Sequence, residues 1–416
     1  MHQPNVQIRR AREADLPEMA RIHYAAFPGA QLTLEERIRH FREDPRLRLE
    51  DHWVCHRGSA MAGIFALYDF RTFRRGKALP VCGIGGVAIS PEARKSRIAY
   101  LMMARALEIM EQNGTPLSIL YPFRHSFYRR LGWGLVGQVK LYYADPAAIP
   151  LFQERQQVFP VLTAEQQEEV MECYRRAAES GNGFLERPDP VWYERVFKNS
   201  QCYAWRSPDS SSVDGYLTFT YQPAPPEQSF VTSELKVLDF VWTSHEALRG
   251  LLGFVAAQRD QVRIVHIPDQ SGVELEHAFH DPRMPDGVHT WSLGAETARI
   301  GWGLMGRIIG LRRTLAAGGF GAGEGYVTFN ITDELNPKNN EPLSVLFKNG
   351  AAEFVVKPGG APQATLECGI AALSSIYWGA LSLPTAVALN LAKVTGSVEL
   401  LSGLFQIPKP VCHDRF

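Results

Sequence analysis

The sequence has no net charge, few cysteines and no long apolar run. Lys and Arg together number 44, as do Asp and Glu, so there is no overall field to attract nucleic acid or an anionic membrane. Its six cysteines contain no CxxC pair, which argues against a disulfide framework and a zinc site. No stretch approaches membrane-span length, and the polar N-terminus lacks the apolar core of a signal peptide. These absences predict a soluble, cytoplasmic, globular protein without a membrane or nucleic-acid partner.

A metal centre is not expected either. His277 and His280 stand three residues apart in EHAFHDP, but the sequence offers no matching cluster of further ligands. The Gly-rich stretch 318–325 fits neither GxGxxG nor GxxxxGK[ST], and no predicted strand leads into it. It is therefore interpreted as a flexible loop.

The length of 416 residues suits two or three domains. Three prolines between residues 145 and 160 indicate a first boundary, and the sequence pattern changes again near Ala298. We expect domains at residues 1–150, 151–296 and 297–416. The mixture of strands and helices predicts α/β and α+β folds.

The most informative stretch runs from Val81 to Gly134. It predicts a strand over Val81–Ile89, a basic loop over Ser90–Arg97, a helix over Ile98–Gln112 and a strand over Leu117–Tyr121, followed by a short helix carrying FYRRLGW. Strand, helix and strand at this spacing form a βαβ unit, so the two strands should be parallel or splayed neighbours. Backbone amides and basic side chains then meet at a helix N-terminus, where proteins bind phosphate groups.

The later chain repeats this order once. Glu234–Trp242 is a predicted strand, Ala247–Gln258 a helix and Val262–Ile267 a strand, without a basic loop between the first two. A second, non-binding copy of the first domain is the economical interpretation. In the last domain we expect a helix over Trp302–Leu315 and a hairpin turn at Asn349-Gly350.

The basic turn SPEARKSRIA has two interpretations. Most basic turns are solvated surface, whereas this one lies between a Gly-rich strand and a long amphipathic helix. The runs GVAISPEARKSRIAYLMMARAL and LYPFRHSFYRRLGWG resemble motifs A and B of the GNAT acyl-CoA N-acyltransferases. Two further segments, VWTSHEALRGLLGFVAAQRDQV and the later MGRI, extend this resemblance. Together with them, the whole chain is similar to the enhanced-intracellular-survival (Eis-like) family.

This resemblance implies tandem GNAT folds followed by a sterol-carrier-protein-like (SCP2-like) α+β domain. It implies acetyl-CoA as co-substrate, an amine of a small molecule or a lysine as acceptor, and assembly into a hexamer or trimer. Tyr128 would be the general acid that protonates the leaving thiolate, and the terminal carboxylate at Phe416 the general base. The residues implied to hold the co-substrate are Val87, Ala88, Ile89, Arg94, Lys95, Ser96, Arg97, Ile98 and Ala99.

One position departs from the family pattern Arg-x-x-Gly-x-Gly/Ala. Arg94 and Ala99 fit, but Arg97 stands where the pattern has its first glycine. Glycine allows close approach of the backbone to phosphates, so the arginine could compensate with charge or occlude the loop. The rival hypothesis is a non-catalytic acyl-CoA-binding protein. A third, lipid carriage by the last domain, rests on fold analogy alone.

Overall fold

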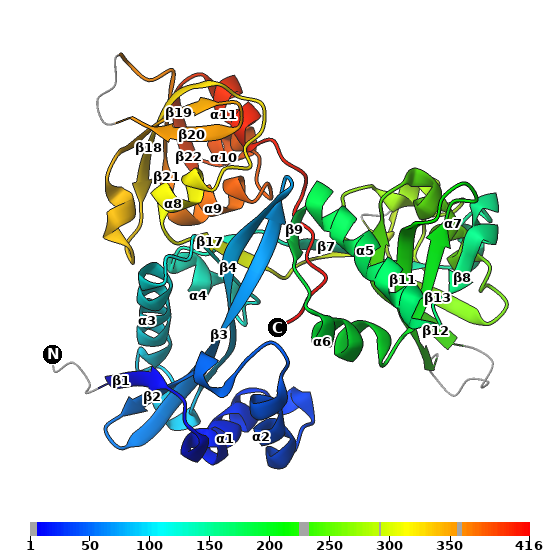
Figure 1. Ribbon diagram of the computed structural model, residues 1–416, viewed down its shortest axis with the longest axis horizontal. Helices are drawn as coiled ribbons and strands as arrows, with labels where there is room; N and C mark the ends of the chain where they lie inside the picture. The colour runs from blue at the N-terminus through cyan, green and yellow to red at the C-terminus, as the bar shows by residue number, and fades with distance from the viewer. Residues whose placement is uncertain (1–5, 224–232, 291–292, 356–359) are drawn as a thin grey trace.

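A computed structural model describes residues 6–223, 233–290, 293–355 and 360–416 of the chain (Figure 1). Three β-sheets, each covered by helices, form the bulk of the molecule. No helix among these described residues is both long and apolar enough to cross a membrane.

The first sheet has the order β1-β2-β3-β4-β5-β17-β6, with β9 beside β3. Its strands are β1 (Val6–Arg10), β2 (His52–Arg57), β3 (Ala60–Arg74), β4 (Lys77–Ile89), β5 (Leu117–Leu120), β6 (Gly134–Leu135), β9 (Asn182–Leu185) and β17 (Met305–Ile308). Its helices are α1 (Leu16–Ala26), α2 (Leu34–Glu43), α3 (Ile98–Gln112) and α4 (His125–Arg130). Trp53 and Cys55 of β2 face α3, whereas Val54 packs with α1 and α2, as the alternation of side chains along a strand requires.

The predicted βαβ unit is confirmed as β4, α3 and β5. The helix spans the expected residues, and its buried stripe includes Ile98, Met102 and Ala106. Val81–Ile84 of β4 pair in parallel with Leu117–Leu120 of β5, and the pairing ends there. The remainder of β4 continues beside β3 alone, so the two parallel strands separate toward the N-terminus of α3.

The second sheet has the order β16-β7-β13-β12-β11-β10-β8. Its strands are β7 (Gln138–Ala144), β8 (Val158–Pro160), β10 (Gln201–Arg206), β11 (Val213–Pro223), β12 (Ser233–Trp242), β13 (Val262–Asp269) and β16 (Ala298–Trp302), with the separate hairpin β14 (His289–Thr290) and β15 (Gly294–Ala295) nearby in the chain. Helix α7 (His245–Ala256) covers one face and α5 (Ala164–Ser180) the other, and α6 (Asp189–Val191) follows β9. The predicted second βαβ unit is confirmed, because β12 and β13 pair in parallel across α7.

The third sheet has the order β20-β19-β18-β21-β22. Its elements are α8 (Leu311–Ala316), β18 (Gly325–Thr332), β19 (Leu343–Lys348), β20 (Ala351–Phe354), β21 (Ala364–Gly369), α9 (Ile370–Tyr377), α10 (Leu383–Ala388), β22 (Ala392–Gly396) and α11 (Val398–Phe405). The Asn349-Gly350 turn is confirmed, with φ values of 51° and 70° at its two residues. Rings of Phe320, Phe329, Phe347 and Phe405 pack edge to face inside the domain.

The helix expected over Trp302–Leu315 is wrong. The chain instead forms β17 (Met305–Ile308), inserted between β5 and β6 of the first sheet, and then the short helix α8. The packing at Gly306 favours the observed strand over the expected helix. A Cβ placed at Gly306 would lie 2.8 Å from the indole nitrogen of Trp378. Close packing against a distant tryptophan decides this segment over its local helical spacing.

Strand β17 also fastens the first sheet to the last domain. Arg307 is fully buried and donates to both carboxylate oxygens of Asp333 at 2.8 and 2.9 Å. Its guanidinium lies over the Trp133 ring, 5.2 Å from the centroid. Trp133 follows α4 closely, so this contact helps to fix the helix that carries Tyr128.

The last ten residues leave the third domain and pass between the first two sheets. Figure 1 shows this segment in red, ending near the centre of the molecule. Asn182 of β9 holds its first half, since the Asn182 side-chain amide donates to the Pro408 carbonyl at 2.9 Å and the Asn182 carbonyl accepts from the Val411 amide at 2.8 Å. We refer to residues 407–416 as the C-terminal segment.

Candidate active site

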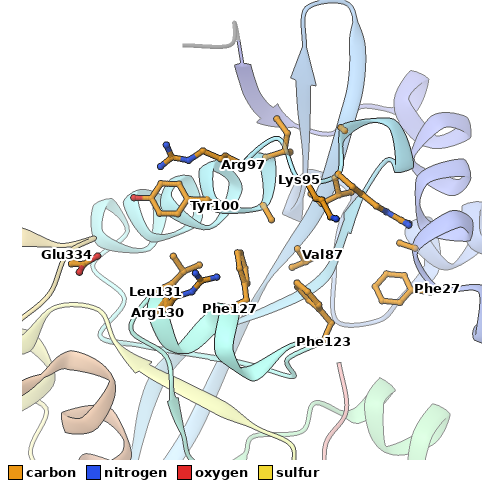
Figure 2. Close-up of a pocket in the computed structure, with 16 residues that line it drawn as sticks. Phe27, Val87, Lys95, Arg97, Tyr100, Phe123, Phe127, Arg130, Leu131 and Glu334 are labelled. Carbon is orange, nitrogen blue, oxygen red and sulfur yellow. The ribbon is translucent and has the colours of Figure 1, made fainter. Parts of the chain in front are cut away.

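A cavity of about 780 Å³ opens between β4, the loop after it, α3 and α4 (Figure 2). Phe123 and Phe127 line it from the α4 side, Val87 from β4, and Tyr100 from α3. Most of the lining is apolar, and its cationic side chains come from the loop after β4 and, in Arg130, from α4. The lining residues are Ala26, Phe27, Val87, Ile89, Ala93, Arg94, Lys95, Arg97, Ile98, Ala99, Tyr100, Phe123, Phe127, Arg130, Leu131 and Glu334.

Strand β4 reaches this cavity through a bulge. Ala66 of β3 pairs with Gly85, whereas Ile64 pairs with Ala88, so β4 has one extra residue at this point. Gly86 adopts φ +58°, a left-handed conformation that costs other residues roughly 1–2 kcal/mol. Beyond Ile84 the pairing with β5 has ended, so backbone groups on that side of β4 are available to a ligand lying between the strands.

The N-terminus of α3 opens on the same cavity. Its first amides have no partner within the helix, and the Arg97 side chain at the N-cap position does not bond to them. The helix has 15 residues and carries no acidic residue in its first turn. Unpaired amides, the positive end of the helix dipole and the side chains of Lys95 and Arg97 together form a site for an anion such as a pyrophosphate.

Arg97 adopts the backbone conformation that a glycine would favour, with φ 64° and ψ 8°. Its guanidinium lies over the Tyr100 ring, 5.2 Å from the centroid. Lys95 is also left-handed, with φ 60°. The loop therefore retains the turn expected of a phosphate loop, and the Arg97 side chain lies along α3.

The predicted co-substrate residues divide into two groups. Val87, Ile89, Arg94, Lys95, Arg97, Ile98 and Ala99 line the cavity. Ala88 points to the other face of β4 and packs in the cluster with Met19 and Ala20 of α1. The Ser96 hydroxyl donates to the Ala93 carbonyl, within the turn itself. The side chains of Ala88 and Ser96 thus shape the strand and the loop, and the cavity wall is made by their neighbours.

Tyr128 lies behind the cavity wall. Its side chain is 2% exposed and packs against Phe123, Phe127 and Trp133, with centroid separations of 5.5, 5.0 and 6.2 Å. Burial raises the pKa of the Tyr128 phenol above its ordinary value. The phenol therefore stays protonated throughout the neutral range.

The Phe416 side chain packs over the middle of β4, where a Cβ placed on Gly83 would lie 3.0 Å from its ring. Its ring contacts Tyr68, Phe70 and Tyr121, with centroid separations of 5.4, 5.1 and 5.4 Å. A Cβ placed on Gly85 would lie 3.5 Å from the Phe416 carboxyl carbon. The last residue thus lies beside the β4 backbone, one residue before the Gly86 bulge.

Contacts from separate elements hold the C-terminal segment in place. Arg187 donates to Asp414 at 2.8 Å and to Asp239 of β12 at 2.6 Å, and all three side chains are largely buried. The Tyr121 hydroxyl donates to the Asp414 carbonyl at 2.8 Å. Gln270 exchanges two hydrogen bonds with the Cys412 backbone, at 2.8 and 2.9 Å.

These anchors were not found from the sequence. Arg187 and Asp239 lie 52 residues apart, and neither occurs in a recognisable motif. Phe123 and Phe127 could have been found, because both stand in the aromatic run before Gly132 that was already singled out. The signal there was the clustering of aromatic side chains around Tyr128.

Among the described residues, the second βαβ unit differs from the first at the N-terminus of its helix. Only two residues separate β12 from α7, and the Ser244 hydroxyl accepts from the Ala247 amide at 3.1 Å. The helix N-terminus therefore bonds to its own cap, whereas that of α3 does not. This difference supports the interpretation of the second unit as a non-binding copy.

Three family profiles match successive segments of the chain. Residues 7–136 and residues 183–308 each match an acetyltransferase (GNAT) domain, and residues 311–413 match a sterol carrier protein domain. No curated protein matches the chain.

Several solved structures share the whole arrangement. A GCN5-related N-acetyltransferase from Anabaena variabilis ATCC 29413 is 20% identical, with a TM-score of 0.81 over 99% of this chain and 100% of that chain. Eis1 from Mycobacterium abscessus is 19% identical, with a TM-score of 0.77 over the same shares. A probable N-acyltransferase from Enterococcus faecalis V583 is 18% identical, with a TM-score of 0.81 over the same shares. The predicted order of tandem GNAT folds and a sterol-carrier-like domain is thereby confirmed.

Proposed function

Since the chain is a GNAT-type N-acetyltransferase of Eis-like architecture, we propose that its first domain transfers an acetyl group from acetyl-CoA to a free amine by direct attack. The observation that carries this proposal is the uncapped N-terminus of α3, which opens beside the separated strands on a single cavity. Such a site suits a long ligand with an anionic end and an apolar arm.

The residues fit the shape and charge of the co-substrate. Lys95, Arg97 and the first amides of α3 would hold the pyrophosphate. Val87 and Ile89 would lie along the pantetheine arm, with Phe127 packing from the opposite wall. When bound, acetyl-CoA supplies the activated acetyl group as a thioester.

The reaction requires two reactants held in line, a stabilised oxyanion and two proton transfers. The amine nitrogen attacks the thioester carbon, forming the new C–N bond, and the C–S bond then breaks. Free amides of β4 near its bulge would stabilise the oxyanion. Tyr128 would donate its phenol proton to the leaving thiolate, which requires the thiolate to reach the phenol past Phe123 and Phe127.

The proton lost by the amine needs an acceptor. We assign this role to the terminal carboxylate at Phe416, which lies beside the β4 backbone at Gly85. A carboxylate of this kind has an ordinary pKa of about 3.3–3.7, so it is a weak base. It acts mainly by orienting the amine and accepting its proton as the C–N bond forms.

The test is a direct assay of the purified full-length protein. Thiol release from acetyl-CoA is measured against a panel of primary amines, and acetylated products are identified by mass spectrometry. Turnover with at least one amine is expected. Tight binding of CoA by calorimetry, without turnover on any amine, would instead favour the rival acyl-CoA-binding protein.

Assembly and location complete the proposal. We propose a cytoplasmic homo-oligomer, a hexamer or trimer, on the strength of the Eis-like architecture. Light scattering on the purified protein should give three or six times the 46.6 kDa chain mass, and a monomer at micromolar concentration would contradict this part.

A further inference from the structure

Two arginines from separate elements converge on the C-terminal segment. Arg46, in the loop after α2, and Arg195, in the helical segment 189–197, both donate to the Arg415 carbonyl, at 2.7 and 2.6 Å. Arg46 lies beneath this contact, with its guanidinium 5.2 Å from the Tyr68 centroid. The side chains of Arg195 and Arg415 are exposed, so a solute can reach both.

Two of the nearby carboxylates are already engaged, and the third, at Phe416, is the proposed base. Asp44 pairs with Arg46 at 2.7 Å, and Asp414 pairs with buried Arg187 at 2.8 Å. In the described part of the chain, neither Arg195 nor Arg415 has a carboxylate within 4 Å. The Arg195 guanidinium, which contacts the Arg415 carbonyl, and the Arg415 guanidinium are therefore each left without a paired carboxylate.

The electrostatics of Arg195 agree with this description. Partial burial lowers the pKa of its guanidinium, and the positive charge of Arg46 lowers it further. Asp44 and Asp414 oppose these effects without reversing them. An arginine whose surroundings disfavour its charge gains from an added anion.

The Arg195 guanidinium contacts the backbone of the residue that precedes the proposed base. Arg415 directly precedes Phe416, and Cα atoms of consecutive residues are about 3.8 Å apart. The Phe416 ring contacts Tyr121, two residues before Phe123 of the cavity wall. The end of the chain thus brings a carboxylate that can contact the amine next to guanidiniums that can bind an anion.

We infer that the acceptor is an amine carrying its own carboxylate, an amino-acid-like compound whose anionic group binds Arg195 and Arg415. This inference rests on the proposed acetyltransferase function and narrows its acceptor class. Arg195 uses one of its five donors on the Arg415 carbonyl, so a bidentate contact with a carboxylate remains open to it. A polycation meets repulsion at the same place.

The test compares matched acceptors that differ by one carboxylate. Lysine is paired with cadaverine, and histidine with histamine, in the thiol-release assay with saturating acetyl-CoA. We expect kcat/KM to be about tenfold or more higher for the carboxylate-bearing member, the size of one charge-assisted hydrogen bond. Most of the difference should lie in KM.

Variants separate acceptor binding from support of the C-terminal segment. Arg195→Gln should reduce the ratio of kcat/KM between the carboxylate-bearing amine and its partner to about twofold or less. The change should come from a higher KM for the carboxylate-bearing amine, while the KM for acetyl-CoA stays unchanged. Arg195→Lys should recover part of it. Arg259→Gln, at an exposed arginine far along the chain, is the matched control and should keep the full preference.

The remaining outcomes contradict either the inference about the acceptor or the proposed function. Equal kcat/KM for both members of each pair, or an equal loss for both in Arg195→Gln, overturns the inference and leaves the acetyltransferase proposal intact. Turnover with no amine at all overturns the proposed function, and the inference with it.

Discussion

The guanidinium of Arg97 lies 5.2 Å from the centre of the Tyr100 ring, while the Arg97 backbone keeps a left-handed φ of 64°. The residue that replaces a glycine in the phosphate loop thus keeps the glycine conformation and directs its side chain along α3. From the sequence alone, Arg97 was the residue that left open whether the phosphate loop can bind the co-substrate and support catalysis. Its geometry favours a working loop.

This relationship predicts how substitutions at Arg97 differ. Arg97→Gly should leave the KM for acetyl-CoA within about threefold, because the turn is already formed and the lost cation is partly offset by closer backbone approach. Arg97→Val should raise this KM about tenfold, because a β-branched residue tolerates positive φ poorly. Steady-state kinetics with varied acetyl-CoA checks both variants. A large gain in turnover for Arg97→Gly would show that the arginine obstructs the loop.

Tyr128 is predicted to act on kcat. Tyr128→Phe keeps the packing against Phe123, Phe127 and Trp133 but removes the proton, so kcat should fall tenfold or more with an unchanged KM for acetyl-CoA. Phe127→Leu is the packing control and should act mainly on that KM, because Phe127 lines the cavity. Full activity of Tyr128→Phe would remove the phenol from the mechanism.

The pH profile provides an independent check on Tyr128. Because burial raises the pKa of its phenol, the acid remains protonated well past neutral pH. The rate of the native protein should therefore show no fall between pH 7 and 9 that depends on Tyr128. In this range the pH profiles of the native protein and of Tyr128→Phe should have the same shape. A falling limb in this window, present in the native protein and lost in the variant, would mean that the phenol ionises there.

Phe416 is predicted to contribute through both its ring and its carboxylate. Deleting the residue moves the chain end away from Gly85, so the rate should fall tenfold or more. Phe416→Ala keeps a terminal carboxylate and loses only the ring contacts with Tyr68, Phe70 and Tyr121, so its loss should be smaller. Equal rates for the native protein and the deletion, measured by thiol release, would contradict the assigned base.

Arg187 is predicted to hold the C-terminal segment. Arg187→Met removes the buried cation between Asp239 and Asp414, and breaking such a pair typically costs about 3–5 kcal/mol. Hydrogen exchange should rise sharply in residues 407–416. Arg249→Met breaks a solvent-exposed pair with Glu154 and should cost less than about 1 kcal/mol, with exchange in this segment unchanged.

Acid should loosen the same anchor. Burial acts to raise the pKa of Asp239, but the charges of Arg187 and His413 and the hydrogen bonds from Arg187 and Tyr216 together outweigh it, so this pKa lies below its unfolded value of about 3.9. A group with a lowered folded pKa contributes stability above its unfolded value and loses it as pH falls. Exchange in residues 407–416, corrected for intrinsic rates, should therefore increase below about pH 4 in the native protein. In Arg187→Met this increase should be absent.

Local sequence patterns were enough to predict the central unit. Helix α3 was expected over Ile98–Gln112 and spans those residues, because its apolar stripe and the Asn113-Gly114 end are both local signals. The parallel neighbours β4 and β5 followed from the spacing of the βαβ unit. Segment 302–315 was mispredicted, since its strand exists only through pairing with β5 and β6.

The sequence by itself determined the three-part architecture, the basic loop and helix α3, because helix periodicity, turn chemistry and family motifs are encoded in neighbouring positions. Only the tertiary structure decided which side chains accompany them. Arg187, Asp239 and Asp414 meet across three distant segments, and Arg46 and Arg195 reach one carbonyl from two domains. Such contacts depend on how sheets pack against one another, and no local spacing encodes that.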